Sequence, residues 1–434
     1  MSFSALLLAA RVLTLEEAVH TAQAHQPQIR AAWAQVHAGQ ARVGEAKAGI
    51  FPRLDANAQY QRSTANFPLS PSFSASSFAV ALKGQPNLLS PGATVNFYTF
   101  GITATATIYD FGRTFGAVDQ SREGEQVNRA DLETTSQSIL LNVRTAYFSV
   151  LAAKELVWVG EETLKNQGKH VQQVQQFVTA GTRPKIDLRS AELNLANAEL
   201  ALLRARNGLD LAKVALNQAM GVEGPTDFDV AEPAEQTLAD ESSAVDDLMI
   251  EALRARPEFL RVEAEVRAQQ ASRRIAKAGY FPALQAFGNF SGTKVSDTKN
   301  GDFDWGLNWY VGGGLTWNLF NGMFTQRQVE EVDAGLDGLA AQRDLTRQQI
   351  RSELEAQLLA VGQAKESLRV SDRAVVTGEE RLKLAEGRYQ AGAGDILELD
   401  DAQVAYSNAK AQRVTAQYDL ATARARLAHA LGRK

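Results

Sequence analysis

The sequence predicts a mainly α-helical protein with a smaller β portion, built from two copies of one helix–strand–strand–helix repeat. Three observations predict this fold class. Similar phrases recur 211 residues apart, long segments carry apolar residues at intervals of seven, and two short segments in each copy alternate apolar and polar residues.

The duplication is clearest in phrases that follow the long apolar segments. "FVTAGTRPKIDLRSAE" at 177–192 returns as "RYQAGAGDILELDDAQ" at 388–403. Upstream, "AGIFP" at 48–52 matches "AGYFP" at 278–282, but the offset there is 230 residues. The first copy therefore holds about 19 extra residues, which we expect in a long exposed loop within 61–96.

Each copy is predicted to contain a long outgoing helix and a return helix. The outgoing helices, 114–180 and 324–390, and the return helices, 184–220 and 395–431, keep a seven-residue apolar repeat, which indicates coiled-coil packing. Each outgoing helix would be roughly 100 Å long at 1.5 Å per residue. Alanine at every second seam position of the return helices indicates close helix packing. The outgoing series are Val143, Val150, Val157, Leu164, Val171 and Val178, then Leu354, Val361, Leu368, Val375, Leu382 and Tyr389; the return series are Leu188, Leu195, Leu202, Leu209 and Leu216 with Ala191, Ala198, Ala205, Ala212 and Ala219, then Ala402, Ala409, Ala416, Ala423 and Ala430.

The alternating segments predict strands at about 53–67, 94–110, 283–294 and 304–320. The apolar face of such a sheet packs on a core or faces lipid. We favour lipid, because Trp and Tyr mark these segments and little else is available to cover them at the far end of such long helices. Four strands cannot close around a lumen, so several chains must share one. The alternative is a coiled-coil structural scaffold with a soluble sheet and no pore.

The chain divides into four parts: 1–13, 14–221, 222–245 and 246–434. The first is an N-terminal tail or signal remnant, because its short apolar run fits a secretory signal and a frayed end equally well. The second and fourth are the structural repeats, and Pro27 and Pro257 break or begin the first helix of each. The third is an acidic linker or equatorial region without Lys or Arg.

Composition and missing motifs exclude several functions. The net charge of −5, without a Lys/Arg cluster, gives no case for nucleic acid, and the lack of cysteine excludes disulfides and thiol chemistry. No phosphate-binding loop, catalytic triad or metal-ligand spacing is present, so we predict no enzyme activity, cofactor or metal site. No apolar run is long enough for a membrane-spanning helix. The histidines are scattered: His20, His25, His37, His170 and His429.

At this point the chain resembles the TolC-type outer membrane efflux protein family. The resemblance covers about residues 14–432 and is carried by the duplicated turn phrases, by "AGIFP" and "AGYFP" before the first strand of each copy, and by "YDFG" and "LFNG" after the second. It implies a homotrimer in the Gram-negative outer membrane. Three protomers would form a 12-stranded β-barrel and a long α-helical periplasmic barrel. The implied function is a passive exit duct for a tripartite efflux pump or type I secretion system, with a periplasmic adaptor protein and an inner-membrane pump as partners.

The resemblance also assigns a pore constriction to Glu398 and Asp401. Their three-residue spacing puts both on one helical face, and three protomers would supply six carboxylates, which favour cations. The alternative is that these acids simply favour a solvated helix N-terminus, where the helix dipole stabilises negative charge.

A closed-tip polar link is implied between Tyr389 and Asp187, although Tyr389 also completes a heptad series. Members of the family carry a basic residue two positions after the second-turn glycine, where this chain has Gly394, so Arg183 in the first turn is the possible latch. Gly181, Gly392 and Gly394 mark the turns where an adaptor would dock. The cargo stays open between drugs, peptides or proteins, and metals. The expected membrane-interface aromatics are Tyr98, Phe100, Trp305, Trp309 and Trp317.

Overall fold

A computed structural model of the chain describes residues 11–64, 94–233, 241, 244–297, 301–302 and 304–433. Its internal contacts divide the chain into two compact units. Unit 1 holds residues 1–36, 127–263 and 341–434, and unit 2 holds residues 37–126 and 264–340. Each unit is described by itself.

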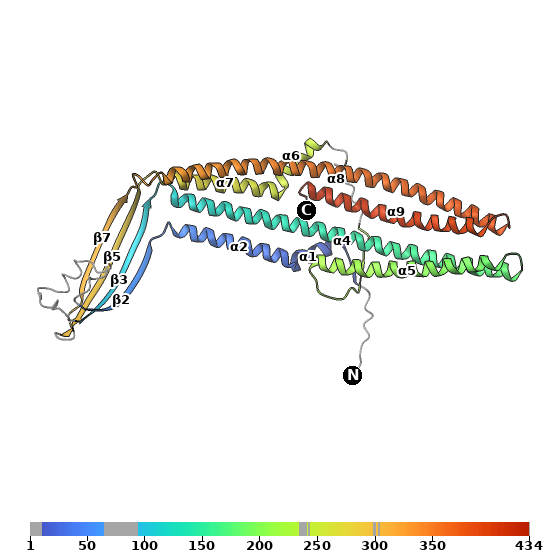
Figure 1. Cartoon of the computed structure of the whole chain (residues 1–434), viewed down its shortest axis with the longest axis horizontal. Helices are drawn as coiled ribbons and strands as arrows, with labels where there is room; N and C mark the ends of the chain where they lie inside the picture. The colour runs from blue at the N-terminus through green and yellow to red at the C-terminus, as the bar shows by residue number, and fades with distance from the viewer. Residues whose placement is uncertain are drawn as a thin grey trace. The chain divides into compact units, whose positions relative to one another are not determined.

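The elements follow the order of a duplicated repeat (Figure 1). The helices are α1 (Leu15–His25), α2 (Pro27–Ala48), α4 (Arg113–Thr179), α5 (Lys185–Met220), α6 (Val245–Ala255), α7 (Pro257–Ala278), α8 (Phe324–Gln390) and α9 (Ile396–Ala430). The strands are β1 (Arg11–Leu13), β2 (Arg53–Thr64), β3 (Thr94–Tyr109), β4 (Phe228–Val230), β5 (Ala283–Asp297), β6 (Gly301–Asp302) and β7 (Gly306–Thr316).

The four long helices begin and end within one residue of the bounds that the heptads predict. In each copy a proline begins the second helix, because its ring fixes a helical φ and its missing N–H costs nothing in the first turn. Strand β7 is shorter than predicted and ends at Thr316 rather than 320. The chain turns there toward Gly322 and Met323, both of which have positive φ. Predicted strand residues 65–67 and most of the loop expected within 61–96 lie outside the described residues.

Residues 11–13 of the predicted tail or signal remnant belong to the folded part of unit 1. These three residues form β1, which pairs in parallel with β4 inside the predicted linker. The fully buried Tyr147 fixes this pair, because its hydroxyl donates to the carbonyl oxygens of Leu13 (2.9 Å) and Ala231 (2.5 Å). No local pattern in three residues encodes a parallel pairing across more than 200 positions. Residues 1–10 lie outside the described part of the chain.

The seven-residue repeats form the interior of unit 1. All five alanines of the α9 series are buried, and every residue of the two outgoing series is buried or half-buried. Small alanine side chains let the helices approach closely, which is the reason for their regular spacing. Next to the turns, one buried cluster draws on all four long helices: Val174, Ala191, Ala385, Tyr389, Ile396, Leu399 and Ala402.

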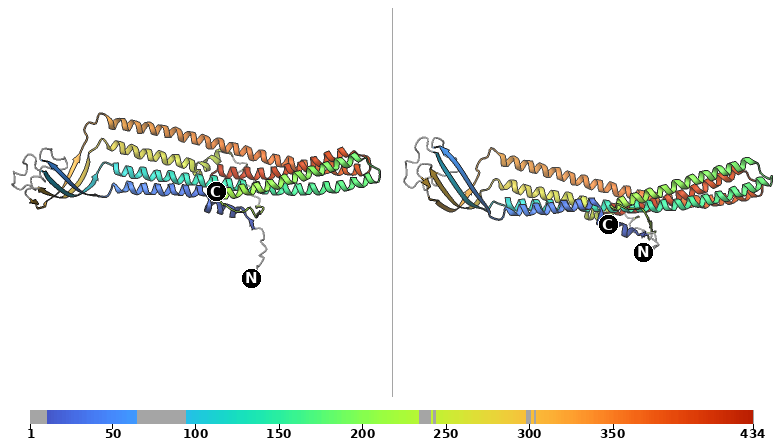
Figure 2. Two further views of the ribbon diagram at one scale, coloured as in Figure 1. Left: turned by 60° about the horizontal axis from the view of Figure 1, so that its bottom comes forward. Right: turned by 90° about the horizontal axis from the view of Figure 1, so that it is seen from below.

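In unit 2, β2, β3, β5 and β7 lie side by side in an antiparallel sheet, and the short β6 also pairs with β5 (Figures 1 and 2). The register gathers mainly apolar residues on one face of the sheet and mainly polar residues on the other, where Phe287 and Tyr310 also lie. Two neighbouring rows illustrate this: Ala56, Ile102, Phe290 and Trp309 on one face, and Asn57, Gly101, Ser291 and Asn308 on the other.

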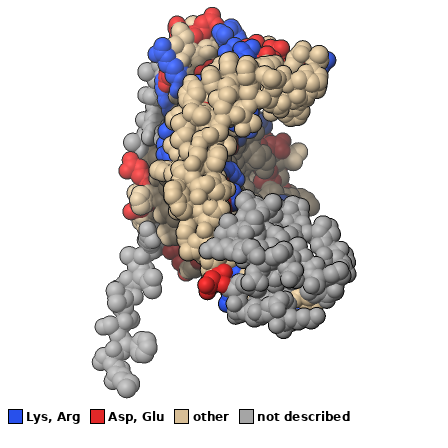
Figure 3. All heavy atoms as spheres, turned by 90° about the vertical axis from the view of Figure 1, so that its left-hand side faces the viewer, with Lys and Arg blue, Asp and Glu red and all other residues tan. Residues whose placement is uncertain are grey.

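The apolar face of the sheet is open. Ile102, Phe290 and Trp309 are all exposed, as are Leu307 and Val311 beside them. Seen from the strand end, the described surface is formed mainly by uncharged residues (Figure 3). An aligned apolar face of this extent requires an apolar surrounding or a partner.

Candidate functional site

Two equivalent turns connect the long helices of unit 1, one between α4 and α5 and one between α8 and α9. In each turn a glycine adopts positive φ, 73° at Gly181 and 74° at Gly392, which side chains disfavour. The next residue, Thr182 or Ala393, donates its backbone N–H to a carbonyl five residues back. This is the Schellman arrangement that ends helices at a glycine.

Arg183 of the first turn reaches the second turn. Its Nη2 donates to the carbonyl oxygens of Tyr389 at 3.0 Å and Gly394 at 3.2 Å. Arg183 and Gly394 occupy equivalent positions in the two copies. A Cβ at Gly394 would lie 3.1 Å from the Arg388 Cβ and from the Tyr389 backbone nitrogen, so the turn is tight for a side chain there. The basic group therefore comes from the first copy and acts within one protomer.

Tyr389 and Asp187 do come together, as a weak link. The Tyr389 hydroxyl donates to Asp187 Oδ2 at 3.4 Å, which is long for a hydrogen bond, and both residues are buried. Burial raises the pKa of Tyr389 to about 12, with a further contribution from the Asp187 charge, so the phenol stays a neutral donor. Tyr389 also packs in the buried cluster beside the turns. Tyr389 thus makes the polar contact and also fills its heptad position, and its role in keeping the tip closed stays a prediction.

Glu398 and Asp401 lie on the first turns of α9. Asp401 is exposed, whereas Glu398 is half-buried and forms an ion pair with Arg388 at 3.4 Å. Within one protomer the Asp401 carboxylate is thus open to solvent and the Glu398 charge is partly compensated by an arginine of α8.

Near the turns lie His170 of α4, which is buried, and Asp400 of α9, whose side chain is 13% exposed, and no motif in the sequence marks them as a site. His170 Nε2 and Asp400 Oδ1 lie 4.0 Å apart, and neither atom has a hydrogen-bond partner. Burial lowers the pKa of His170 and raises that of Asp400 to about 6, the latter supported by repulsion from Asp401 and opposed by a hydrogen bond from Asn194. The sequence holds one signal for His170: it lies seven residues before the apolar Phe177, so the heptad repeat places a polar side chain in line with an apolar one.

The expected membrane-interface aromatics lie in or beside the sheet of unit 2. Tyr98 packs against Tyr60 with 5.1 Å between ring centres, and Phe100 packs against Trp305 at 5.2 Å. Trp305 and Trp309 are exposed. Trp317 is also exposed and lies just beyond the end of β7, where its indole N–H donates to the Tyr280 carbonyl.

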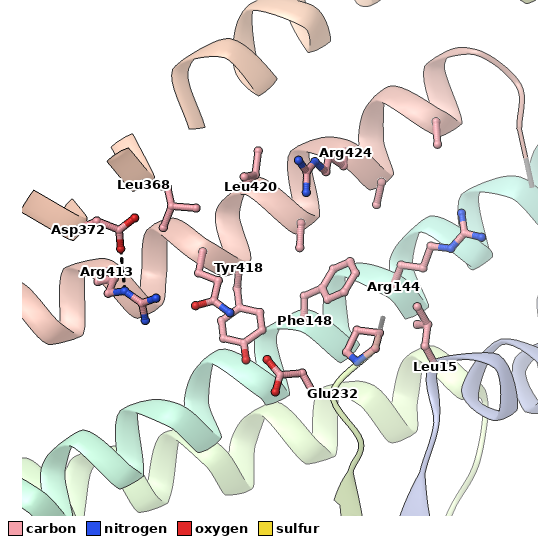
Figure 4. Close-up of a pocket in the computed structure, with 15 residues that line it drawn as sticks. Leu15, Arg144, Phe148, Glu232, Leu368, Asp372, Arg413, Tyr418, Leu420 and Arg424 are labelled. Atoms are coloured by element: carbon pink, nitrogen blue, oxygen red, sulfur yellow. Dashed lines mark hydrogen bonds and ion pairs between the residues drawn. The ribbon is translucent and has the colours of Figure 1, made fainter. Parts of the chain in front are cut away.

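A cavity of about 380 Å³ lies in unit 1 between α4, α8, α9 and the linker residues Glu232 and Pro233 (Figure 4). Phe148 and Leu420 form part of its apolar wall. Arg413 is paired with Asp372 at 2.8 Å. Burial lowers the pKa of Arg144, and burial together with nearby glutamates raises the pKa of Tyr418 to about 12. Glu232 and Pro233, which also line the cavity, are followed by residues 234–240 outside the described ranges.

Among the described residues, no group of three His, Asp or Glu side chains is placed to hold a metal ion. No helix in the described part of the chain is long and apolar enough to cross a membrane.

Comparison with known proteins identifies relatives along nearly the whole chain. The family model described as outer membrane efflux protein matches residues 18–222 and 248–433. Outer membrane protein TolC of Salmonella enteritidis is 21% identical, over 96% of this chain and 83% of the relative. The solvent efflux pump outer membrane protein SrpC of Pseudomonas putida is 23% identical, over 77% of this chain and 71% of the relative.

Solved structures share the fold. The OprN outer-membrane channel superposes with a TM-score of 0.80 at 19% identity, over 97% of this chain and 90% of that chain. The outer membrane protein VceC from Vibrio cholerae superposes with a TM-score of 0.78 at 18% identity, over 96% of each chain.

Proposed function

Because the chain belongs to the outer membrane efflux protein family, we propose that it is the passive exit duct of a tripartite efflux pump or type I secretion system. An outer membrane channel for efflux is the function of the family, and this function involves no catalysis. The resemblance predicted from the duplicated motifs is thereby confirmed. The cargo, the gate and the partners of this chain belong to the proposal.

The sheet of unit 2 is the observation that carries the proposal. Its apolar residues are aligned across four strands and exposed, while its other face presents Asn, Ser and Thr together with the aromatic pair Phe287 and Tyr310. Burying apolar area contributes about 25 cal/mol per Å², so leaving this face in water is unfavourable. Lipid against the apolar face and a water-filled lumen against the polar face would give each face a suitable environment. The scaffold alternative, with a soluble sheet, leaves the apolar face without cover.

A second exposed apolar pattern supports assembly. On α5, Ile186, Leu193 and Leu200 are exposed and recur at intervals of seven. Such a stripe is a coiled-coil seam without a partner helix in the described part of its own chain. We infer that neighbouring copies cover it. Three copies would bring twelve strands together, which is enough to enclose a lumen.

The proposed duct is closed at the turns of unit 1. Arg183, with Tyr389 and Asp187, holds the two hairpins α4–α5 and α8–α9 together, and Glu398 and Asp401 line the constriction. A periplasmic adaptor would dock at the turns marked by Gly181, Gly392 and Gly394, and an inner-membrane pump would supply the energy. The partial pairing of Glu398 with Arg388 leaves Asp401 as the stronger candidate for cation selection.

Single-channel recording in a planar lipid bilayer tests the proposal. The purified protein would be measured in a salt gradient, with a polyvalent cation added to each side in turn, and its oligomeric state determined in detergent. We expect a trimer and discrete cation-selective steps that are blocked from one side. A monomer that stays soluble without detergent and forms no channel, even with Arg183→Ala, would instead establish the scaffold.

A further inference from the structure

The four connections between helices and strands in unit 2 form one continuous band (Figure 1). They are residues 49–52, 110–112, 279–282 and 317–323, and their order follows the strand order of the sheet. Each connection contacts the next through close packing, ring stacking or a hydrogen bond. The contacting pairs are Gly49 with Thr114 (3.4 Å from a Cβ built on the glycine to Cγ2), Phe111 with Phe281 (4.8 Å between ring centres) and Trp317 with Tyr280 (3.1 Å from the indole nitrogen to the carbonyl oxygen).

This junction band is apolar and open. Leu319 and Phe320 are 78% and 79% exposed, so the described part of the chain leaves them almost uncovered. A continuous exposed apolar surface of this kind marks a contact with a partner or a membrane. The exposed apolar residues in and directly beside the band are Ile50, Phe51, Tyr109, Phe111, Phe115, Tyr280, Phe281, Trp317, Leu319, Phe320, Met323 and Phe324.

The backbone of the band is strained at two of these side chains. Phe111 and Met323 have φ of 54° and 65°, and in the described part of the chain they are the only residues other than glycine with positive φ. Each stands beside a glycine that also has positive φ, Gly112 in the first copy and Gly322 in the second. A second glycine would avoid the strain at no steric cost. An exposed apolar side chain at such a position favours a contact outside the chain.

Three cations border the band. Lys47, Arg113 and Lys277 are exposed, and their side chains form no ion pair or hydrogen bond with another described residue. Lys47 lies three residues before Ile50, and Lys277 lies three residues before Tyr280. The helix dipole favours a cation in the last turn of α2 and α7, but it disfavours one at Arg113, the first residue of α4. Stabilisation of helix ends therefore explains two of these cations and not the third.

We propose that the junction band binds anionic phospholipids, with Lys47, Arg113 and Lys277 contacting the headgroup phosphates. Aromatic side chains favour the boundary between lipid and water, and basic side chains beside it attract anionic headgroups. An apolar protein partner would cover the band but would leave the three cations unpaired. This inference rests on the proposed function in a membrane. The band lies at the opposite end of the strands from Tyr98 and Trp305.

Native mass spectrometry of the detergent-solubilised protein tests the inference. Dioleoyl phosphatidylglycerol and dioleoyl phosphatidylethanolamine are titrated separately, because they share their acyl chains and differ in headgroup charge. The band variant carries Lys47→Gln, Arg113→Gln and Lys277→Gln. A control matched in charge changes three exposed lysines of unit 1, Lys165→Gln, Lys169→Gln and Lys185→Gln.

We expect the wild type and the control to bind phosphatidylglycerol more tightly than phosphatidylethanolamine. The band variant should lose affinity for phosphatidylglycerol by about fivefold for each cation removed, with little change for the other lipid. Leu319→Ser with Phe320→Ser should weaken both lipids alike, because it removes apolar contact only.

Equal binding of the two lipids by the wild type, or an equal loss in the control, would overturn the inference and leave the channel proposal standing. Loss of the trimer in the band variant would assign the band to a neighbouring copy and would also overturn it. Selective lipid binding by a protein that forms no channel would support the inference and contradict the proposed function.

Discussion

The guanidinium carbon of Arg183 lies 4.4 Å from the centre of the Tyr389 ring, and the same group donates to two carbonyl oxygens of the second turn. Arg183 belongs to the first copy and Tyr389 to the second. One side chain thus combines a cation–π contact with hydrogen bonds between the two hairpins. This relationship makes Arg183 the first residue to change.

Arg183→Ala is expected to open the channel. It removes the two hydrogen bonds and the cation–π contact, together worth about 1–3 kcal/mol, which corresponds to a rise of about 5- to 150-fold in the ratio of open to closed channels. Single-channel recording measures this rise. The matched control is Arg189→Ala, which removes an arginine whose ion pair lies within α5. Equal currents in the two variants would show that Arg183 does not hold the tip.

Tyr389→Phe is expected to have a smaller effect than Arg183→Ala. The hydroxyl makes one long bond of 3.4 Å, and the aromatic ring that Arg183 and the apolar cluster contact is retained. The loss should be about 0.5–1 kcal/mol. The comparison uses the same recordings. A larger rise in current for Tyr389→Phe would make the polar link, and not the arginine, the main closing contact.

Asp400→Asn is expected to stabilise the folded protein at pH 7.5. The folded-state pKa of Asp400 is raised to about 6, mainly by burial, so its contribution favours folding in acid and is lost as pH rises through about 6. An amide avoids the buried charge, a gain of about 1–3 kcal/mol at pH 7.5 that disappears below pH 4. Chemical unfolding of the detergent-solubilised protein at both pH values measures it.

The lowered pKa of His170 acts in the opposite direction, because its contribution is lost as pH falls from 6.5. Asp400→Asn removes only the contribution of the Asp400 carboxylate to the free energy of unfolding. The difference between variant and wild type therefore measures that contribution alone. Asp419→Asn, an exposed aspartate on the same helix, is the control and should change nothing. A gain at pH 4 as large as that at pH 7.5 would contradict the buried-charge explanation.

Glu398→Ala with Asp401→Ala should weaken cation preference and block by polyvalent cations, while leaving the assembly intact. Arg388→Gln should act in the other direction, because it frees the Glu398 charge from a partner at 3.4 Å. Reversal potentials in a salt gradient give both shifts. Loss of the trimer in the double variant would show that these acids are structural.

Leu202→Asp should prevent assembly. Leu202 is buried on α5, and its Cβ lies 3.7 Å from the position of a Cβ built on Gly160 of α4, so a carboxylate there would be buried without a partner. We expect a loss of about 3 kcal/mol or more. Gel filtration in detergent reports assembly. An assembled Leu202→Asp protein would undermine the heptad assignment.

Much of the fold follows from local pattern. Helix α8 spans the whole segment that the heptads of the second copy mark, and the alternation around Trp309 predicts both the strand and its apolar face. The turns at Gly181 and Gly392 follow from residues that tolerate positive φ. These features depend only on residues that are close together in the sequence. The end of β7 does not follow from the alternation alone, because it depends on the turn after Thr316.

The sequence by itself determined the duplication, the four long helices, the two-faced strands and the family. Each of these rests on a repeat or a periodic pattern, which can be recognised from the order of the residues alone. Only the tertiary structure decided the contacts between the copies. It paired β1 with β4, turned Arg183 toward Tyr389 and Gly394, and set His170 against Asp400. These contacts join residues some 200 positions apart, and their geometry depends on helix register, which no single segment encodes.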